Sequence, residues 1–190
     1  MANYDKAFEK ALINEGTYSN HPADRGGETY KGIARKFHAN WLGWKVIDKA
    51  KQKSGFPKSL DKNAELHEHV KILYREQYWA PINGDNIPNQ EIAEEIFDTG
   101  VNMGIRRSAR FLQESINLLS KNEKLQADLI VDGAIGRNTI KALNKTLKKD
   151  KSNRYVMLLL NLFQGMRYIS ILQANPSQEV FTRGWLNRTV

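Results

Sequence analysis

The chain has 190 residues, and its 29 Lys and Arg residues outnumber its 21 Asp and Glu residues, which gives a formal net charge of +8. It contains no cysteine, which excludes disulfide scaffolds, zinc sites built on cysteine and thiol nucleophiles. Its 41% hydrophobic and 26% charged residues are typical of a globular protein, and its length suits one domain or two small ones.

The first half of the chain is predicted to be mostly helical. Apolar residues recur with helical spacing over residues 4–15, and Glu15 lies on that apolar face in its last turn. The polar turn formers of residues 17–28 predict a loop or a short irregular hairpin. Thr29 is expected to cap a helix over residues 30–37. Two further helices are predicted, over residues 41–52 and after a cap at Asp61 or Asn63.

A turn-rich connection over residues 79–88, with two prolines and an Asn-Gly-Asp run, marks the expected boundary between two regions. Residues 1–88 form one region and residues 89–190 the other, and the two regions can still pack as one body. The second region is also predicted to be helical. Its longest helix is expected over residues 152–174, because Pro176 follows.

The chain shows no obvious targeting or membrane segment. Its longest apolar stretch, Val156 to Phe163, is interrupted by Asn161 and is too short to cross a bilayer. The N-terminal residues lack the basic and apolar regions of a Sec-type signal peptide. We therefore expect that the protein is synthesised in the cytoplasm and that it does not insert into a membrane.

Glu15 is the first candidate for a chemical role. A carboxyl group held against an apolar helix face loses solvation, which raises its pKa and favours the protonated form that a general acid needs. The alternative is structural, because Glu15 can also pair with an arginine or with the amides of the following loop. Position alone favours the structural role.

The loop after Glu15 adds a second carboxyl and a hydroxyl. Asp24 lies nine residues beyond Glu15, and Thr29 lies five residues beyond Asp24. Two carboxyl groups that flank a cleft can protonate a leaving oxygen and orient a water molecule, as glycoside hydrolysis requires. Asp24 can instead cap the turn that its Asp-Arg-Gly-Gly context forms.

The segment from Glu15 to Ile33 resembles the signature of the glycoside hydrolase family 108 N-acetylmuramidases. The family pattern is Glu-Gly-Gly-Tyr, a short loop, Asp-x-Gly-Gly-x-Thr and then Gly-Ile, and this chain departs from it at Thr17, where the second Gly usually stands. These enzymes lie in the lysozyme-like superfamily and include prophage endolysin-like proteins once called secretion activity proteins. The resemblance implies a mainly α, lysozyme-like fold with a minor β element near this loop. It also implies that Glu15 is the catalytic acid, with Asp24 and Thr29 as further catalytic residues.

The second region carries a resemblance of its own. Residues 109–113, Ala-Arg-Phe-Leu-Gln, and residues 131–139 resemble the helix and the Asp-Gly turn of a predicted peptidoglycan-binding domain found in the same proteins. The C-terminal residues 181–188 also fit the family's ending. Physically, Asp132-Gly133 gives a tight turn, and Thr139 is expected to cap the next helix. A structural role is preferred for these individual residues.

Four side chains are candidates for binding substrate. Asp98 and Asn102 lie four residues apart on a predicted helix, where they can hydrogen-bond sugar hydroxyls or acetamido groups, or else cap the helix end before Gly104. Tyr18 and Tyr78 can stack on sugar faces, although an isolated aromatic residue more often belongs to the core.

Other kinds of site are less well supported. His67 and His69 lie two residues apart on a predicted helix and point to different faces, so they make a poor metal pair. No metal or cofactor is expected. The basic cluster of Lys141, Lys145, Lys148, Lys149 and Lys151 is typical of a solvated face, and it can also attract an anionic polymer. No basic-aromatic recognition motif accompanies it, so nucleic acid is not the expected partner.

These observations predict a peptidoglycan hydrolase that cleaves the β-1,4 bond between N-acetylmuramic acid and N-acetylglucosamine in glycan strands. The basic charge fits an anionic cell wall. Such an enzyme acts at the wall or in the periplasm after release through a holin or a dedicated export route. The alternatives are a non-catalytic peptidoglycan-binding or secretion-accessory protein, and a lytic transglycosylase that uses the same glutamate.

Overall fold

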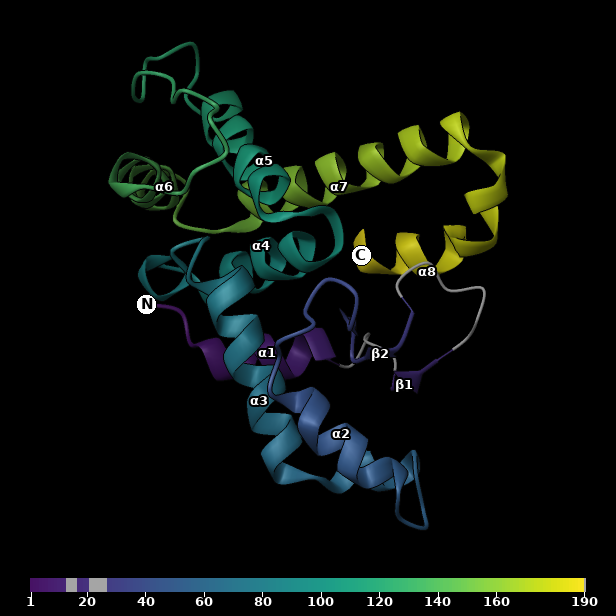
Figure 1. Ribbon diagram of the computed structural model, residues 1–190. Coiled ribbons are helices and arrows are strands. Elements are labelled where there is room, and N and C mark those ends of the chain that lie inside the picture. Colours follow the sequence, from purple (N-terminus) through teal and green to yellow (C-terminus); the bar gives the residue numbers. More distant parts are fainter. Residues whose placement is uncertain (13–16, 21–26, 190) are drawn as a thin grey trace. The chain divides into compact units, whose positions relative to one another are not determined.

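The computed structural model describes residues 1–12, 17–20 and 27–189, and helices dominate these segments (Figure 1). Their α-helices are α1 (Tyr4–Leu12), α2 (Gly43–Lys51), α3 (Ala64–Tyr74), α4 (Gln90–Met103), α5 (Ile105–Leu118), α6 (Arg137–Asp150), α7 (Arg154–Ala174) and α8 (Thr182–Leu186). The strands are β1 (Tyr18–Ser19), β2 (Thr29–Tyr30) and β3 (Ile33–Ala34). The predicted mainly α fold class with a minor β element is therefore confirmed.

The contacts within the chain divide it into two compact units. One unit, the outer unit, consists of Met1–Ala7 and Tyr78–Val190, and the other, the inserted unit, consists of Phe8–Gln77. The chain leaves the outer unit within α1 and returns to it in η2 (Arg75–Trp79), a π-helical turn that continues from α3. The outer unit is thus built from two separate parts of the sequence.

The inserted unit contains the small sheet. β2 pairs antiparallel with both neighbours, so that Tyr30 lies opposite Tyr18 on one side and opposite Ile33 on the other. The predicted helix over residues 30–37, with its cap at Thr29, is wrong. Lys31 and Gly32 have φ angles of 43° and 75°, and two consecutive residues with positive φ form the tight turn that joins antiparallel strands.

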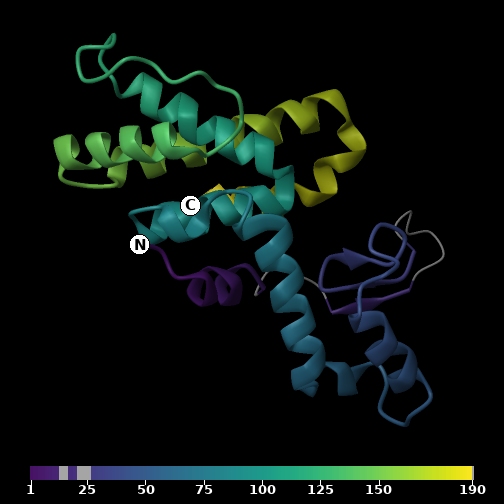
Figure 2. The ribbon, with the colours of Figure 1, turned by 60° about the vertical axis from the view of Figure 1, so that its left-hand side comes forward.

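Below the sheet, α2 and α3 pack together and supply the core of the inserted unit (Figure 2). Asn63 caps α3 by accepting a hydrogen bond from the Leu66 amide at 2.9 Å, which confirms one of the two predicted caps. The buried side chains come from α1, the sheet, α2, η1 (Lys58–Lys62) and α3, and they include Phe8, Tyr30, Ile33, Trp44, Ile47, Leu60, Leu66, Val70 and Tyr74. Two tyrosine hydroxyls donate to backbone carbonyls, Tyr30 to Leu60 and Tyr74 to Lys31.

In the outer unit, α4, α5 and α7 pack against one another. The rings of Tyr4, Trp79 and Phe97 meet with centroids 5.5–6.0 Å apart, which joins the N-terminal residues to α4. Gln164 of α7 donates to the Thr99 hydroxyl of α4 at 3.0 Å, and both side chains are buried. This polar pair fixes the register of two otherwise apolar helix faces.

The C-terminal segment turns back along α7, as the yellow end of the ribbon shows (Figure 1). Trp185 of α8 stacks on Tyr168 of α7 with ring centroids 5.1 Å apart. Burial raises the pKa of Tyr168 to about 12. This packing covers one side of the last turns of α7.

The predicted long helix is confirmed as α7, but the apolar stretch is longer than the sequence analysis considered. By length and composition α7 could cross a membrane, since an 18-residue window has a mean hydropathy of 1.3. Only 22% of that window is buried. Tyr155, Leu158, Leu162 and Met166 are among its exposed apolar residues.

Candidate active site

Two of the predicted catalytic residues, Glu15 and Asp24, lie outside the described residues. In sequence, Glu15 falls between α1 and β1, and Asp24 falls between β1 and β2. Thr29, the third predicted catalytic residue, lies in β2, where it pairs with Ser19 of β1 and Ala34 of β3. The sheet therefore fixes the segments on both sides of the Asp24 loop.

A network of four charged side chains, which we call the Glu28 cluster, ties the start of β2 to α2. Arg35 contacts Glu28 at 2.7 Å through Nε and holds both carboxylate oxygens of Asp48 at 2.6 Å and 3.1 Å through its two terminal nitrogens. Lys51 Nζ lies 2.6 Å from Glu28 and 3.1 Å from Asp48. The cluster therefore ties Glu28, the residue directly before the predicted catalytic Thr29, to α2.

The pKa shifts within the Glu28 cluster follow from these contacts. The hydrogen bonds from Arg35 lower the pKa of Asp48, and the bond to Asp48 raises the pKa of Arg35. For Lys51, the bonds to Glu28 and Asp48 outweigh burial and raise its pKa. Arg35 also lies over the Trp44 ring, with its guanidinium carbon 4.5 Å from the ring centroid.

Tyr18, a predicted substrate-binding residue, lies beside this cluster. Its ring packs edge-on against Phe56 at a centroid distance of 4.7 Å. Burial and a hydrogen bond to Glu28 raise the pKa of the Tyr18 hydroxyl. The structure therefore brings Tyr18 and Thr29 together on adjacent strands, with Glu28 as their common neighbour.

The sequence analysis missed the Glu28 cluster. Glu28 stands at the variable position of the Asp-x-Gly-Gly-x-Thr pattern, and Asp48 and Lys51 are three residues apart on α2. The spacing of Asp48 and Lys51 predicts a helical pair. Nothing in the sequence indicates that Arg35 contacts both Glu28 and Asp48, because these contacts depend on the hairpin at residues 29–34.

The other predicted binding residues belong to the outer unit. Tyr78 lies in the π-helical turn η2, a geometry that recurs at functional sites. Asp98 accepts hydrogen bonds from Arg188 at 2.9 Å and 3.1 Å, and Asn102 donates to its carboxylate at 3.1 Å. The helix end itself is formed by Gly104, with a φ of 90°. Asp98 thus anchors the C-terminal segment to α4.

The residues of the second motif are brought together around Gln113 of α5. The Gln113 amide donates to Asp132 at 2.8 Å and to the Ala134 carbonyl at 3.0 Å, and its oxygen accepts from the Gly133 amide at 2.9 Å. The bonds from Gln113 and from the Ala134 amide lower the pKa of Asp132. Gly133 has a φ of 79°, and a Cβ there would lie 2.8 Å from the Arg106 carbonyl oxygen.

The start of α6 differs from the prediction. The helix begins at Arg137 after a cap at Gly136, so Thr139 lies inside the first turn and is not its cap. The buried Thr139 hydroxyl contacts the Ala134 carbonyl at 3.4 Å and so closes the turn from within. The motif is structural in its contacts, as the sequence analysis preferred.

Within the part of the chain that the structure describes, no group of three His, Asp or Glu side chains is placed to hold a metal ion. His69 lies 3.9 Å from Glu65, and His67 lies 3.6 Å from Glu9. Each histidine thus faces a different carboxylate.

Comparisons with known proteins match two families, and the first match extends from the inserted unit into α4 of the outer unit. The chain matches the glycosyl hydrolase 108 family over residues 8–104 and the family described as a predicted peptidoglycan domain over residues 107–190. A search of curated proteins found no match. The solved structure of SagA from Brucella abortus is similar, with a TM-score of 0.60 and 23% identity over 98% of this chain and 88% of that one. These matches support a peptidoglycan hydrolase with a lysozyme-like fold, and the chain belongs to the glycosyl hydrolase 108 family.

Proposed function

We propose that the protein is an N-acetylmuramidase, which hydrolyses the β-1,4 bond from N-acetylmuramic acid to N-acetylglucosamine with Glu15 as general acid. The observation that carries this proposal is the order Glu15, Asp24 and Thr29 inside the segment that matches the hydrolase family. The reaction needs no metal or cofactor.

The described geometry around these residues supports the proposal. Thr29 is fixed by strand pairing on both sides, and Glu28 is held by two cations. A catalytic group must be held within a fraction of an ångström of its working position, so these contacts favour a catalytic role for Thr29. Asp98 and Asn102, by contrast, contact each other and the C-terminal segment, which favours a structural role for them.

The proposed chemistry uses two carboxyl groups. Glu15 gives its proton to the glycosidic oxygen while the bond from that oxygen to the anomeric carbon breaks. In an inverting reaction, a water molecule adds to the anomeric carbon and Asp24 accepts its proton. In a retaining reaction, Asp24 first bonds to the anomeric carbon, and Glu15, now a carboxylate, accepts the proton of the water that displaces Asp24. The products are a reducing muramic acid end and a free hydroxyl on the glucosamine, so atoms and charge balance.

The test is a Glu15→Gln variant assayed on purified cell-wall sacculi. Glutamine keeps the size of the side chain but cannot donate the proton, so we expect turbidity clearing to fall by at least about 100-fold, the usual contribution of a general acid. The matched control is Glu9→Gln, because Glu9 lies on the same stretch of chain with its side chain 66% exposed. The control should clear sacculi at the parent rate.

Mass spectrometry of the released fragments separates the proposal from its alternatives. Reducing muramic acid ends support hydrolysis at the proposed bond. A 1,6-anhydro end identifies a lytic transglycosylase, and bound but intact glycan identifies a binding or secretion-accessory protein. A Glu15→Gln protein that still clears sacculi at the parent rate contradicts the proposed role of Glu15.

For the cellular setting, we propose synthesis in the cytoplasm and action at the wall or in the periplasm, as for endolysin-like proteins of prophages. A holin or a dedicated export route then brings the enzyme to its substrate. Expression with and without a co-expressed holin tests this, since only the pair should lyse the host cell.

A further inference from the structure

Two adjoining pockets lie on the inserted unit. One, the lysine pocket, has a volume of about 560 Å³ and is lined by Lys45, Lys49, Lys53, Val46, Ala50 and Asn63. The other, the aromatic pocket, has a volume of about 510 Å³ and is lined by Phe37, Trp41, Ile72, Glu76 and Gln77. Leu42 and His69 line both pockets, so the two form one continuous surface.

The lysine pocket carries an uncompensated positive charge. Lys45, Lys49 and Lys53 are all exposed and recur every four residues along α2 and the turn that follows it. The ion pairs of α2 use Asp48 and Lys51 instead, and the three pocket lysines take part in none with any described residue. Like charges four residues apart on a helix repel each other, so this row favours an anionic ligand.

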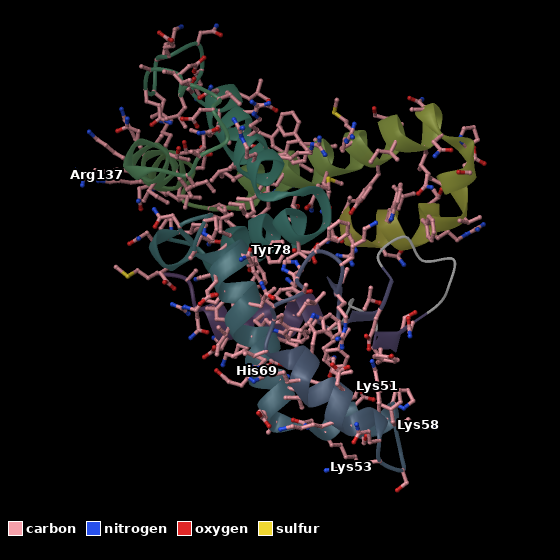
Figure 3. The ribbon with its side chains drawn as sticks, viewed as in Figure 1. Lys51, Lys53, Lys58, His69, Tyr78 and Arg137 are labelled. Atoms are coloured by element: carbon pink, nitrogen blue, oxygen red, sulfur yellow. The ribbon has the colours of Figure 1, made fainter. Side chains whose placement is uncertain are left out.

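The position of the row is visible in the structure. Figure 3 labels Lys53 at the far end of α2 and His69 on α3, the two helices between which the lysine pocket lies. Glu65 also lines the pocket, but it lies toward His69 at 3.9 Å. The lining therefore holds three lysines against one carboxylate.

The floor of the lysine pocket is aliphatic. Val46 and Ala50 are half-buried between the lysines, and Leu42, which is 54% exposed, joins the floor to the aromatic pocket. A ligand that fits must therefore present carboxylates at its edge and small apolar groups at its centre. At the rise of a helix, the eight-residue step from Lys45 to Lys53 corresponds to about 12 Å, which is the length of about four residues of an extended peptide.

The aromatic pocket presents a platform that is fixed before any ligand binds. Trp41 Nε1 donates to the His69 carbonyl at 3.2 Å, and the Trp41 ring packs edge-on against Trp44 with centroids 5.2 Å apart. Gly43 leaves room for the Trp41 ring, because a Cβ at Gly43 would lie 2.2 Å from it. Phe37 beside it is 73% exposed. Exposed aromatic faces of this kind suit the apolar face of a sugar ring.

We infer that these two pockets form an accessory site for a muropeptide, with the acidic peptide stem along the lysine row and the sugar against Phe37 and Trp41. This inference rests on the proposed function, because it takes peptidoglycan to be the substrate. A stem peptide carries both alanine methyl groups and free carboxylates along one short chain, and these are the two kinds of group that the aliphatic floor and the lysine row can contact. The site would hold a strand by its stem while the catalytic residues act on the glycan.

The test uses a soluble probe in which N-acetylglucosamine is linked to N-acetylmuramic acid. The N-acetylmuramic acid of this disaccharide carries its tetrapeptide stem. This probe lacks the bond that the proposed enzyme cleaves, so binding is read without turnover, and a failure of the proposed catalysis leaves the measurement valid. Titration calorimetry compares the parent with a triple variant, Lys45→Gln, Lys49→Gln and Lys53→Gln. We expect the Kd to rise at least 10-fold.

The control is the triple variant Lys6→Gln, Lys58→Gln and Lys62→Gln, because these three exposed lysines line neither pocket and lie outside residues 107–190. It should bind the probe like the parent, and the disaccharide without its stem should bind the parent at least 10-fold more weakly. Phe37→Ala should weaken binding of the complete probe. Circular dichroism checks that all variants fold.

Three outcomes overturn the inference. The first is a pocket variant that binds the probe like the parent. The second is an equal loss in the control triple variant, which would show that net charge alone attracts the probe. The third is a glycerol-phosphate oligomer that competes for the lysine row as tightly as the muropeptide does, which would assign the pocket to a phosphate polymer.

Discussion

Arg35 joins Glu28 to Asp48, with both carboxylate oxygens of Asp48 within 3.1 Å of the guanidinium group. One side chain thus connects the residue before the predicted catalytic threonine to the middle of α2. The bidentate geometry restricts how the two elements can rotate against each other. The position of Glu28, the residue before Thr29, therefore depends on Arg35.

The first prediction concerns Asp48→Asn. Asp48 is 48% exposed, so the loss of its pair with Arg35 should cost about 1 kcal/mol and lower the Tm by about 2–4 °C at pH 7. Because the pKa of Asp48 is lowered in the folded state, its contribution is present above pH 3.8 and is lost as the pH falls below that value. The gap in Tm between parent and variant should close below about pH 4.

Thermal unfolding at pH 7, 5, 4 and 3 checks this prediction, and 0.5 M salt should shrink the gap at pH 7. A constant gap across the whole pH range would mean that Asp48 stabilises the fold by packing and not by its charge.

The second prediction concerns Gly133→Ala. The φ of 79° and the close Arg106 carbonyl both oppose a side chain, so the variant should lose at least about 1–3 kcal/mol of stability. Gly184→Ala is the control, because a Cβ at Gly184 in α8 meets no atom within 4 Å. Its Tm should stay or rise slightly. Urea unfolding followed by circular dichroism measures both, and equal stability of the two variants would contradict the strain argument.

The third prediction concerns Gln113→Leu. The substitution leaves the buried Gly133 amide without its acceptor, at a cost of about 1–3 kcal/mol. It should also return the pKa of Asp132 toward its ordinary value, because the Gln113 hydrogen bond is the largest cause of its lowering. Side-chain carboxyl NMR signals report that pKa. Gln126→Leu, which breaks only contacts of 3.3 Å and 3.4 Å, should change stability less.

The fourth prediction concerns Asp98→Asn. The Asp98 and Arg188 side chains are only 21% and 16% exposed, so the substitution removes a negative charge next to a largely buried guanidinium group. We expect faster protease cleavage after α7 and a change in Trp185 fluorescence. Asn102→Ala, which removes the bond at 3.1 Å, should change neither by much. A raised KM with unchanged protease resistance in both variants would instead assign the pair to glycan binding.

The sequence predicted the helices correctly where the spacing of apolar residues is helical over several turns. α2, α3 and α7 lie where helical periodicity placed them, and Asn63 caps α3 as expected. The hairpin at β2 and β3 was predicted as a helix because the spacing of Tyr30, Ile33 and Ala34 fits a helical face over so short a segment. The hairpin depends on the positive φ angles of Lys31 and Gly32, and these are supported by the pairing of β2 with β3 and by the hydrogen bond from the Tyr74 hydroxyl to the Lys31 carbonyl.

The candidate site was predictable only in part, for a physical reason. The residues of the family pattern lie close together in sequence, so the resemblance to that pattern is enough to predict Glu15, Asp24 and Thr29 as catalytic residues. The contacts next to Thr29 come from elsewhere in the chain, since Lys51 reaches Glu28, and Asp48 reaches Arg35, only once α2 has packed against the sheet. The same holds for Arg188, which reaches Asp98 across 90 residues of chain.

The split outer unit sets the order in which the chain can complete its structure during synthesis. The Asn3 amide bonds to the Gln90 side chain at 2.6 Å, and the Tyr4 ring packs on Trp79 and Phe97. At the usual rates of translation, the ribosome needs about 5–20 s to make these partners after Tyr4 has emerged. Met1–Ala7 therefore cannot pack until the rest of the outer unit has been synthesised, whereas Phe8–Gln77 already contains every residue of the inserted unit. A nascent chain stalled shortly after Gln77 should expose Tyr4 and Ala7 to chaperones that the finished protein never meets.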